Sequence, residues 1–153
     1  MVIVLDTFPT SCVSKRPGSG APGVSDRCRE WINECEIAGH QIMIPAISYF
    51  EALRELEQRQ ATNQILRLKR FCLQPHRFIS LTTAHLELAA QLWGQSRRTG
   101  RPTADPHALD GDVIIAAQVI SLGLSASELL VATTNPAHLS RYVPSNLWTN
   151  IKP

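Results

Sequence analysis

The sequence predicts an α/β fold: a three-layer sandwich with a central, mainly parallel sheet flanked by helices. Short apolar runs alternate along the chain with longer segments whose apolar residues recur at helical spacing. The runs Val2–Leu5 and Leu129–Ala132 are continuous and apolar, as strands buried on both faces should be. Strands that alternate with helices favour a parallel sheet with right-handed crossover connections.

The other elements follow from the same criteria. Two more strands are expected, at Gln41–Ile44 and Phe78–Leu81. Helices are expected from Ser25 to Ala38 with Gly39 as the stop, as a pair from about Ser48 to Phe71, from Ala84 to Trp93, and from Val113 to Leu122. Loops are expected at Phe8–Gly23, which is rich in Pro, Gly and Ser, and at Gly100–Leu109.

Length and composition fit one globular domain over residues 1–153. Apolar residues make up 44% of the chain and charged residues 18%, which excludes a disordered protein. The net charge is only +2, so a nucleic-acid contact would have to come from local basic clusters.

Neither the N-terminus nor the cysteines indicate export from the cell. The first apolar run ends at Asp6 without a basic leader, and no stretch reaches the roughly 20 apolar residues of a membrane span. We therefore expect a cytoplasmic protein without a membrane partner. The cysteines lack Cys-x-x-Cys spacing, which favours reduced thiols over a zinc site or disulfides: Cys12, Cys28, Cys35 and Cys72.

Several acidic and amide side chains occur where a predicted strand ends or a predicted helix begins. Asp6 and Asn135 come after buried strands, Glu51 opens a helix, and Asp110 and Asp112 open the most apolar helix. In a parallel sheet these positions lie at the carboxyl edge, where ligands bind. Carboxylates gathered there repel one another unless they share protons or a cation, and Mg²⁺ prefers such oxygen ligands. A divalent ion there could promote phosphodiester cleavage by activating water.

Each of these residues also has a purely structural interpretation. Asp6 could cap a turn, and Ser48 with Glu51 fits a capping box. Asp110 and Asp112 could be an N-cap and a first-turn acid of the same helix. Asn135 before Pro136 is a common turn signal. The metal-site interpretation depends on all these positions sharing one edge of the sheet.

Four blocks of the sequence, taken in order, resemble the PIN domain. They are Leu5-Asp6-Thr7 after the first strand, Glu51 at a helix start, Asp112-Val-Ile-Ile-Ala-Ala, and Val131-Ala-Thr-Thr-Asn135 followed by His138-Leu139. The chain is most similar to the VapC-like branch found in bacterial type II toxin–antitoxin pairs. The resemblance extends from Met1 to about Trp148.

The resemblance implies an endoribonuclease that depends on Mg²⁺ or Mn²⁺. It also implies a homodimer that is neutralised by a cognate antitoxin protein. By position, Asp6, Glu51 and Asp112 resemble the catalytic metal-binding acids of the family. Asn135 takes the place of the fourth acid, with Thr134 beside it, and Asp110 is expected to supplement the metal ligands.

The segment after Thr7 departs from the family pattern. The family usually continues with Asn and an apolar helix, whereas this chain has Phe8 and Pro9. Because Pro9 disfavours helical geometry at Phe8, a rearranged loop is expected beside the metal site. This leaves two alternatives to the nuclease: a degenerate PIN module that binds RNA or a protein partner without cleavage, and a plain α/β interaction domain whose acids are caps.

Two basic clusters are candidates for contact with RNA. One comprises Arg67, Lys69 and Arg70, and the other comprises Arg97, Arg98 and Arg101. Arginine suits bidentate contact with phosphate, although a solvated helix face is the simpler interpretation of each cluster. The second cluster precedes the acidic helix in sequence, so we expect it, together with Thr134, to contact the RNA.

Overall fold

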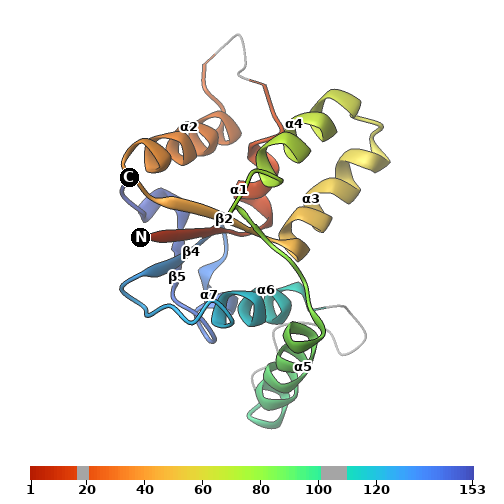
Figure 1. The fold of residues 1–153 in the computed structure, drawn as a ribbon, viewed down its shortest axis with the longest axis vertical. Helices are drawn as coiled ribbons and strands as arrows, with labels where there is room; N and C mark the ends of the chain where they lie inside the picture. Colours follow the sequence, from red (N-terminus) through yellow and green to blue (C-terminus); the bar gives the residue numbers. More distant parts are fainter. Residues whose placement is uncertain (17–20, 101–109) are drawn as a thin grey trace.

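The computed structural model describes residues 1–16, 21–100 and 110–153, and its centre is a parallel sheet (Figure 1). Within those residues the sheet has five strands in the order β3-β2-β1-β4-β5, and every pairing is parallel. The strands are β1 (Val2–Leu5), β2 (Gln41–Pro45), β3 (Phe78–Ile79), β4 (Leu129–Thr133) and β5 (Ser145–Leu147). The predicted α/β fold with a mainly parallel sheet is confirmed.

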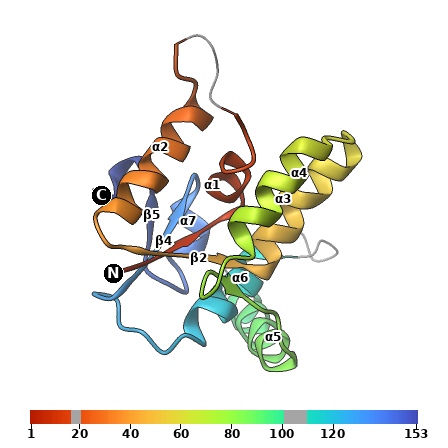
Figure 2. The same cartoon turned by 45° about the horizontal axis from the view of Figure 1, so that its top comes forward.

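Helices cover both faces of the sheet. They are α1 (Thr7–Cys12), α2 (Val24–Ile37), α3 (Ala46–Gln58), α4 (Thr62–Cys72), α5 (Thr83–Arg98), α6 (Gly111–Ile120), α7 (Pro136–Leu139) and the 3₁₀ turn η1 (Trp148–Asn150). In Figure 2, α1 to α4 lie on one side of the strands and α5 and α6 on the other. None of the helices in the described ranges has both the length and the apolar character needed to cross a membrane.

The central strand β1 contributes to a separate hydrophobic core on each face. Ile3 and Leu5 are fully buried with Trp31 and Leu68 in the core beneath α2 and α4. Val4 faces the other way, into the core formed by α5 and α6, which includes Ile115. Burying one such side chain contributes about 1.5–3 kcal/mol. The strand is therefore held from both sides, and this fixes the position of Asp6 at its end.

The segment after β1 begins as a helix, so the loop predicted for Phe8–Gly23 is wrong over its first residues. Asp6 caps α1 by accepting a hydrogen bond from the Thr7 amide at 2.6 Å, and Thr10 N–H donates to the Asp6 carbonyl. Pro9 occupies the third helical position, where its missing N–H leaves no helical hydrogen bond unmade. Phe8 packs against the core, and this burial outweighs the steric preference that precedes a proline.

The start of α3 also differs from the prediction. The helix begins at Ala46 rather than about Ser48, with Pro45 as its N-cap residue. Ser48 is fully buried inside the helix, and Glu51 lies in the second turn. The capping-box interpretation of Ser48 and Glu51 is therefore wrong.

Other boundaries agree more closely with expectation. Helix α2 starts one residue before Ser25 and ends before Gly39, whose φ of +86° explains why glycine stops it. Helix α5 is longer than predicted, and β5 and α7 were not predicted. The predicted loop at Gly100–Leu109 lies outside the described residues except for its first residue.

Candidate active site

Adjacent central strands bring Asp6 next to Thr133. Leu5 of β1 is in register with Ala132 of β4, and the Asp6 amide donates to the Ala132 carbonyl at 3.0 Å. The hydroxyl of Thr133, which is fully buried, donates to Asp6 Oδ2 at 2.5 Å. The two oxygens of the Asp6 carboxylate thus accept from Thr7 and Thr133, and the side chain is fixed at the carboxyl edge of the sheet.

Glu51 reaches the same edge from α3. Its Oε2 accepts a short hydrogen bond from the hydroxyl of Thr7, the residue after Asp6. Its Oε1 lies 3.1 Å from the position that a β-carbon would occupy on Gly111, the first residue of α6. Gly111 lacks that atom, so the Glu51 carboxylate can lie against the start of α6. Three elements, α1, α3 and α6, therefore meet around this carboxylate.

Asp112 lies in the first turn of α6 and is in electrostatic contact with the other acids. Burial raises the pKa of Asp112, and the negative charges of Asp6 and Asp110 raise it further. His138, in α7, is 3.1 Å from Asp112 Oδ2 through Nδ1, and this contact offsets part of the rise in the pKa. The ionised form of Asp112 is thus disfavoured unless positive charge is supplied.

The remaining predicted site residues lie nearby with different exposures. Asp110 is the N-cap residue of α6, and its side chain is buried without capping the helix. Asn135 follows β4, and its amide donates to the Thr133 hydroxyl at 3.0 Å. The side chains of Thr134 and Asn135 are exposed. The structure thus brings Asp6, Glu51, Asp110 and Asp112 to one edge and places Asn135 beside them.

Three residues that orient these acids belong to the sequence blocks that resemble the PIN domain, but no role was predicted for them. Thr7 and Thr133 donate to Glu51 and Asp6, and His138 contacts Asp112. Threonine at a strand end carries no distinctive pattern. For His138 the available signal was its place three residues after Asn135, at the edge where the strands end.

The donor set fits a partly hydrated hard cation. Among the described residues, no group of three or more His, Cys, Asp or Glu side chains is arranged to enclose an ion. Mg²⁺, however, usually binds through one or two carboxylates and keeps several waters. Asp6 and Asp112 are close enough for the charge of one to raise the pKa of the other, and a cation would relieve that repulsion.

The basic residues predicted to contact RNA lie at the end of α5. Arg97 stacks its guanidinium 4.3 Å from the ring centre of Trp93, and Arg98 is exposed. Both occupy the last turn of the helix. Arg101 lies outside the described residues.

Comparison with known proteins identifies the fold. No protein-family sequence profile matches the chain, and no curated protein sequence does. Solved structures match it over nearly its whole length. VapBC-1 from nontypeable Haemophilus influenzae has a chain with a TM-score of 0.64 and 17% identity, covering 98% of this chain and 100% of its own. The structure of VapBC2 from Rickettsia felis bound to a DNA fragment from their promoter has a chain with a TM-score of 0.65 and 17% identity. This match covers 97% of the present chain and 99% of the matched one. This chain therefore has the α/β fold of the matched chains in these two VapBC structures.

Proposed function

We propose that the chain is a single PIN-like nuclease domain that cleaves RNA phosphodiesters with Mg²⁺ or Mn²⁺. The observation that carries this proposal is the meeting of Asp6, Glu51 and Asp112, from three separate segments, at the carboxyl edge of the sheet. Besides burial, the charges of Asp6 and Asp110 raise the pKa of Asp112, an effect that acids spread evenly over the surface would not have. A divalent cation is the simplest compensation for this charge.

The residues divide into those that would hold the ion and those that orient them. Asp6 and Asp112 would be ligands, with Glu51, Asp110 and the Asn135 carbonyl completing the set directly or through water. The orienting groups are Thr7, Thr133 and His138, which contact Glu51, Asp6 and Asp112 respectively. When bound, the cation would activate water and stabilise negative charge on the phosphate.

The start of α6 would help to hold the scissile phosphate. Its first residue, Gly111, is beside Glu51, and its first-turn amides have no partners within the helix. The positive end of the helix dipole favours a phosphate brought to the carboxylates by a cation. Thr134 and Asn135, which are exposed at the same edge, would contact the RNA next to the cleaved bond.

We further propose that the protein is the toxin of a type II toxin–antitoxin pair, acting in the cytoplasm as a homodimer. Both similar structures are VapBC assemblies. Large exposed apolar side chains on α3, on α4 and directly after α4 support a protein partner such as an antitoxin: Phe50, Leu66 and Leu73 are each more than half exposed. The four cysteines are buried and unpaired, which suits a reducing compartment.

Cleavage of a fluorescent single-stranded RNA tests the nuclease proposal. Cleavage should require Mg²⁺ or Mn²⁺, stop in EDTA, and fall at least a hundredfold in Asp6→Asn and Asp112→Asn because each removes a ligand charge. The matched control is Glu34→Gln, an exposed acid on α2, which should cleave like the wild type. Cleavage that persists in EDTA, or that survives both aspartate substitutions, would overturn the proposal.

A second candidate is a PIN module that binds RNA without cutting it. The observation that favours it is the neutral Asn135 at the position that the family fills with a fourth acid, which lowers the charge available to hold a cation. This candidate predicts RNA binding without turnover in any metal. Asn135→Asp would then strengthen metal binding and bring out cleavage, whereas in an active nuclease it would change the rate only modestly.

A further inference from the structure

A hollow of about 450 Å³ lies between Arg16, in the segment after α1, and the start of α4. Its polar lining consists of two arginines, three amide side chains and a hydroxyl: Arg16, Arg67, Gln60, Asn63, Gln64 and Thr62. We call it the cationic hollow. Among the described residues no aromatic side chain lines it, so it offers hydrogen bonds and charge rather than a surface for stacked bases.

No acid of the described residues pairs with the two arginines that line the hollow. Among the described residues, no carboxylate lies within 4.0 Å of the charged groups of Lys15, Arg16 or Arg67. The nearby acid Asp26 pairs with Arg29 at 3.4 Å. The hollow therefore carries the charges of Arg16 and Arg67 with no carboxylate of the described residues beside them, although the whole chain carries a net charge of only +2.

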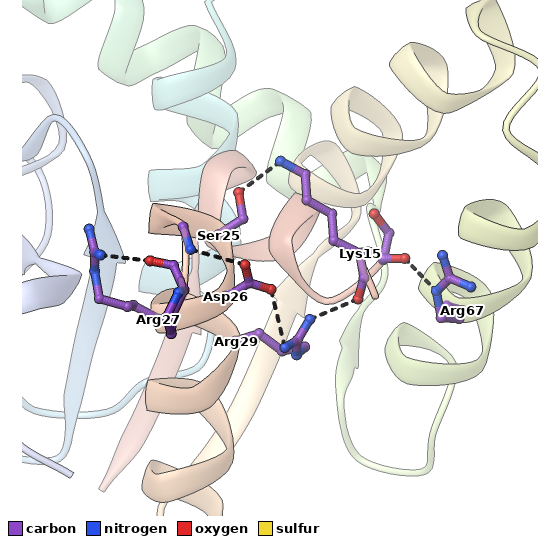
Figure 3. A network of polar contacts seen from close by, with 9 residues as sticks. Lys15, Ser25, Asp26, Arg27, Arg29 and Arg67 are labelled. Atoms are coloured by element: carbon purple, nitrogen blue, oxygen red, sulfur yellow. Dashed lines mark hydrogen bonds and ion pairs between the residues drawn. The ribbon is translucent and has the colours of Figure 1, made fainter. Parts of the chain in front are cut away.

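Neutral acceptors hold two of these side chains in position (Figure 3). Arg67 Nε donates to the Ser14 carbonyl at 2.6 Å, and Lys15 Nζ donates to the Ser25 hydroxyl at 2.8 Å. Arg29 braces the same segment by donating to the Lys15 carbonyl at 3.0 Å. Because Arg67 uses only Nε in this contact, its two terminal amino groups remain available to bind a phosphate.

The hollow lies within reach of a strand bound at the acidic site. Asp6 caps one end of α1, and Arg16 lies four residues beyond the other end. Five helical rises, plus the turn that follows α1 counted as if it were fully extended, give a separation of at most about 25 Å. That distance corresponds to about seven stacked nucleotides at a rise of about 3.4 Å.

We infer that the cationic hollow binds the sugar-phosphate backbone of the single-stranded RNA, several nucleotides from the bond that is cut. This inference rests on the proposed ribonuclease function. Arg16 and Arg67 contact phosphates, while the amide and hydroxyl groups of Asn63 and Thr62 suit the ribose hydroxyls. The contact is with the backbone, so it adds affinity without adding sequence preference.

Fluorescence anisotropy tests the inference, with a labelled single-stranded RNA of about 12 nucleotides, a common single-strand site size, in EDTA to prevent cleavage. Arg16→Gln with Arg67→Gln should raise Kd about tenfold or more. The slope of log Kd against log salt should fall by about 0.7 for each lost phosphate contact. The matched control, Lys152→Gln, removes an exposed charge near the C-terminus and should bind like the wild type. Arg16→Glu breaks no hydrogen bond of the described structure and should weaken binding even if Arg67→Gln unfolds the protein.

The possible outcomes separate this inference from the proposed function. If the wild type cleaves RNA but the arginine variants keep its Kd and salt slope, the hollow is not part of the RNA site. If Arg98→Gln weakens binding while Arg16→Glu does not, the RNA runs along α5 instead. Tighter binding of a DNA duplex than of RNA at the hollow also overturns the inference. A wild type that neither binds nor cuts RNA in any metal overturns the proposed function itself.

Discussion

Replacing Thr133 by valine should destabilise the protein because it removes a hydrogen bond to an ionised group at a buried position. The Thr133 hydroxyl donates to Asp6 Oδ2 at 2.5 Å and accepts from the Asn135 amide at 3.0 Å. Thr133 is fully buried, so the lost donor cannot be replaced directly by water. Hydrogen bonds to charged groups contribute about 1.5–3 kcal/mol, whereas the exposed Asn135 segment can turn its amide to solvent at little cost.

We therefore expect Thr133→Val to lower the free energy of unfolding by about 2 kcal/mol. For a chain of this size that corresponds to a fall in Tm of about 4–8 °C. The measurement is urea unfolding followed by circular dichroism at pH 7 in EDTA. Thr133→Ser keeps the hydroxyl and should lose only about 1 kcal/mol for the buried methyl group.

Thr134→Val is the matched control because the neighbouring threonine is exposed, and it should change stability by less than about 0.5 kcal/mol. The reasoning fails if Thr133→Val unfolds within about 0.5 kcal/mol of the wild type. It also fails if Thr134→Val is as destabilising as Thr133→Val.

Three further predictions concern Glu51 and Asp112 and the residues that contact Glu51. Gly111→Ala places a β-carbon 3.1 Å from Glu51 Oε1, so the carboxylate must shift by a few tenths of an ångström. This shift should reduce kcat about tenfold without lowering Tm. Full activity of the variant would contradict the prediction. Thr7→Val removes the hydroxyl that holds Glu51 and should also reduce kcat, by about three- to tenfold, with the exposed Thr149→Val as the unaffected comparison. Asp112→Asn should raise the free energy of unfolding at pH 7 in EDTA by about 1 kcal/mol, as urea unfolding would measure. The sign of this change follows from the raised pKa of Asp112 in the folded protein. As the pH rises above about 3.9, the pKa of an aspartate in the unfolded chain, the unfolded chain loses this proton before the folded protein does. Rising pH therefore lowers the free energy of unfolding of the wild type. The difference in free energy of unfolding between Asp112→Asn and the wild type should therefore shrink toward about pH 4. A difference that stays constant with pH would refute this prediction.

The sheet was predictable because its strands carry an unambiguous pattern. Val2–Leu5 and Leu129–Thr133 are buried on both faces, and such runs have few other interpretations. Since parallel strands share one carboxyl edge, the approach of Asp6 to the segment after β4 followed directly from the order of the elements.

Helix α1 was not predictable from local preferences. Pro9 and the following Pro, Gly and Ser residues indicate a loop, but the Asp6 cap and the burial of Phe8 decide in favour of a helix. The packing of Phe8 depends on contacts with residues distant in the sequence, which local preferences do not contain. The start of α3 was misjudged for a related reason, because Ser48 is buried by tertiary packing rather than placed at a helix cap.

Within the site, the acids could be predicted but the groups that orient them could not. Carboxylates at strand ends and helix starts are conspicuous in a sequence. The partners Thr7, Thr133 and His138 are recognised only from geometry, since threonine and histidine occur in many roles. Gly111 and Glu51 are 60 residues apart in sequence, and their closeness likewise depends on the packing of α3 against α6.

Calorimetric titration with Mn²⁺ tests most directly whether these carboxylates form a metal site. The wild type should bind about one ion per chain, with affinity that weakens at acid pH as Asp112 takes up a proton. Binding should be lost in Asp6→Asn and Asp112→Asn and kept in Glu34→Gln. A wild type that gives no binding heat, or aspartate variants that bind Mn²⁺ as tightly as the wild type, would contradict the account.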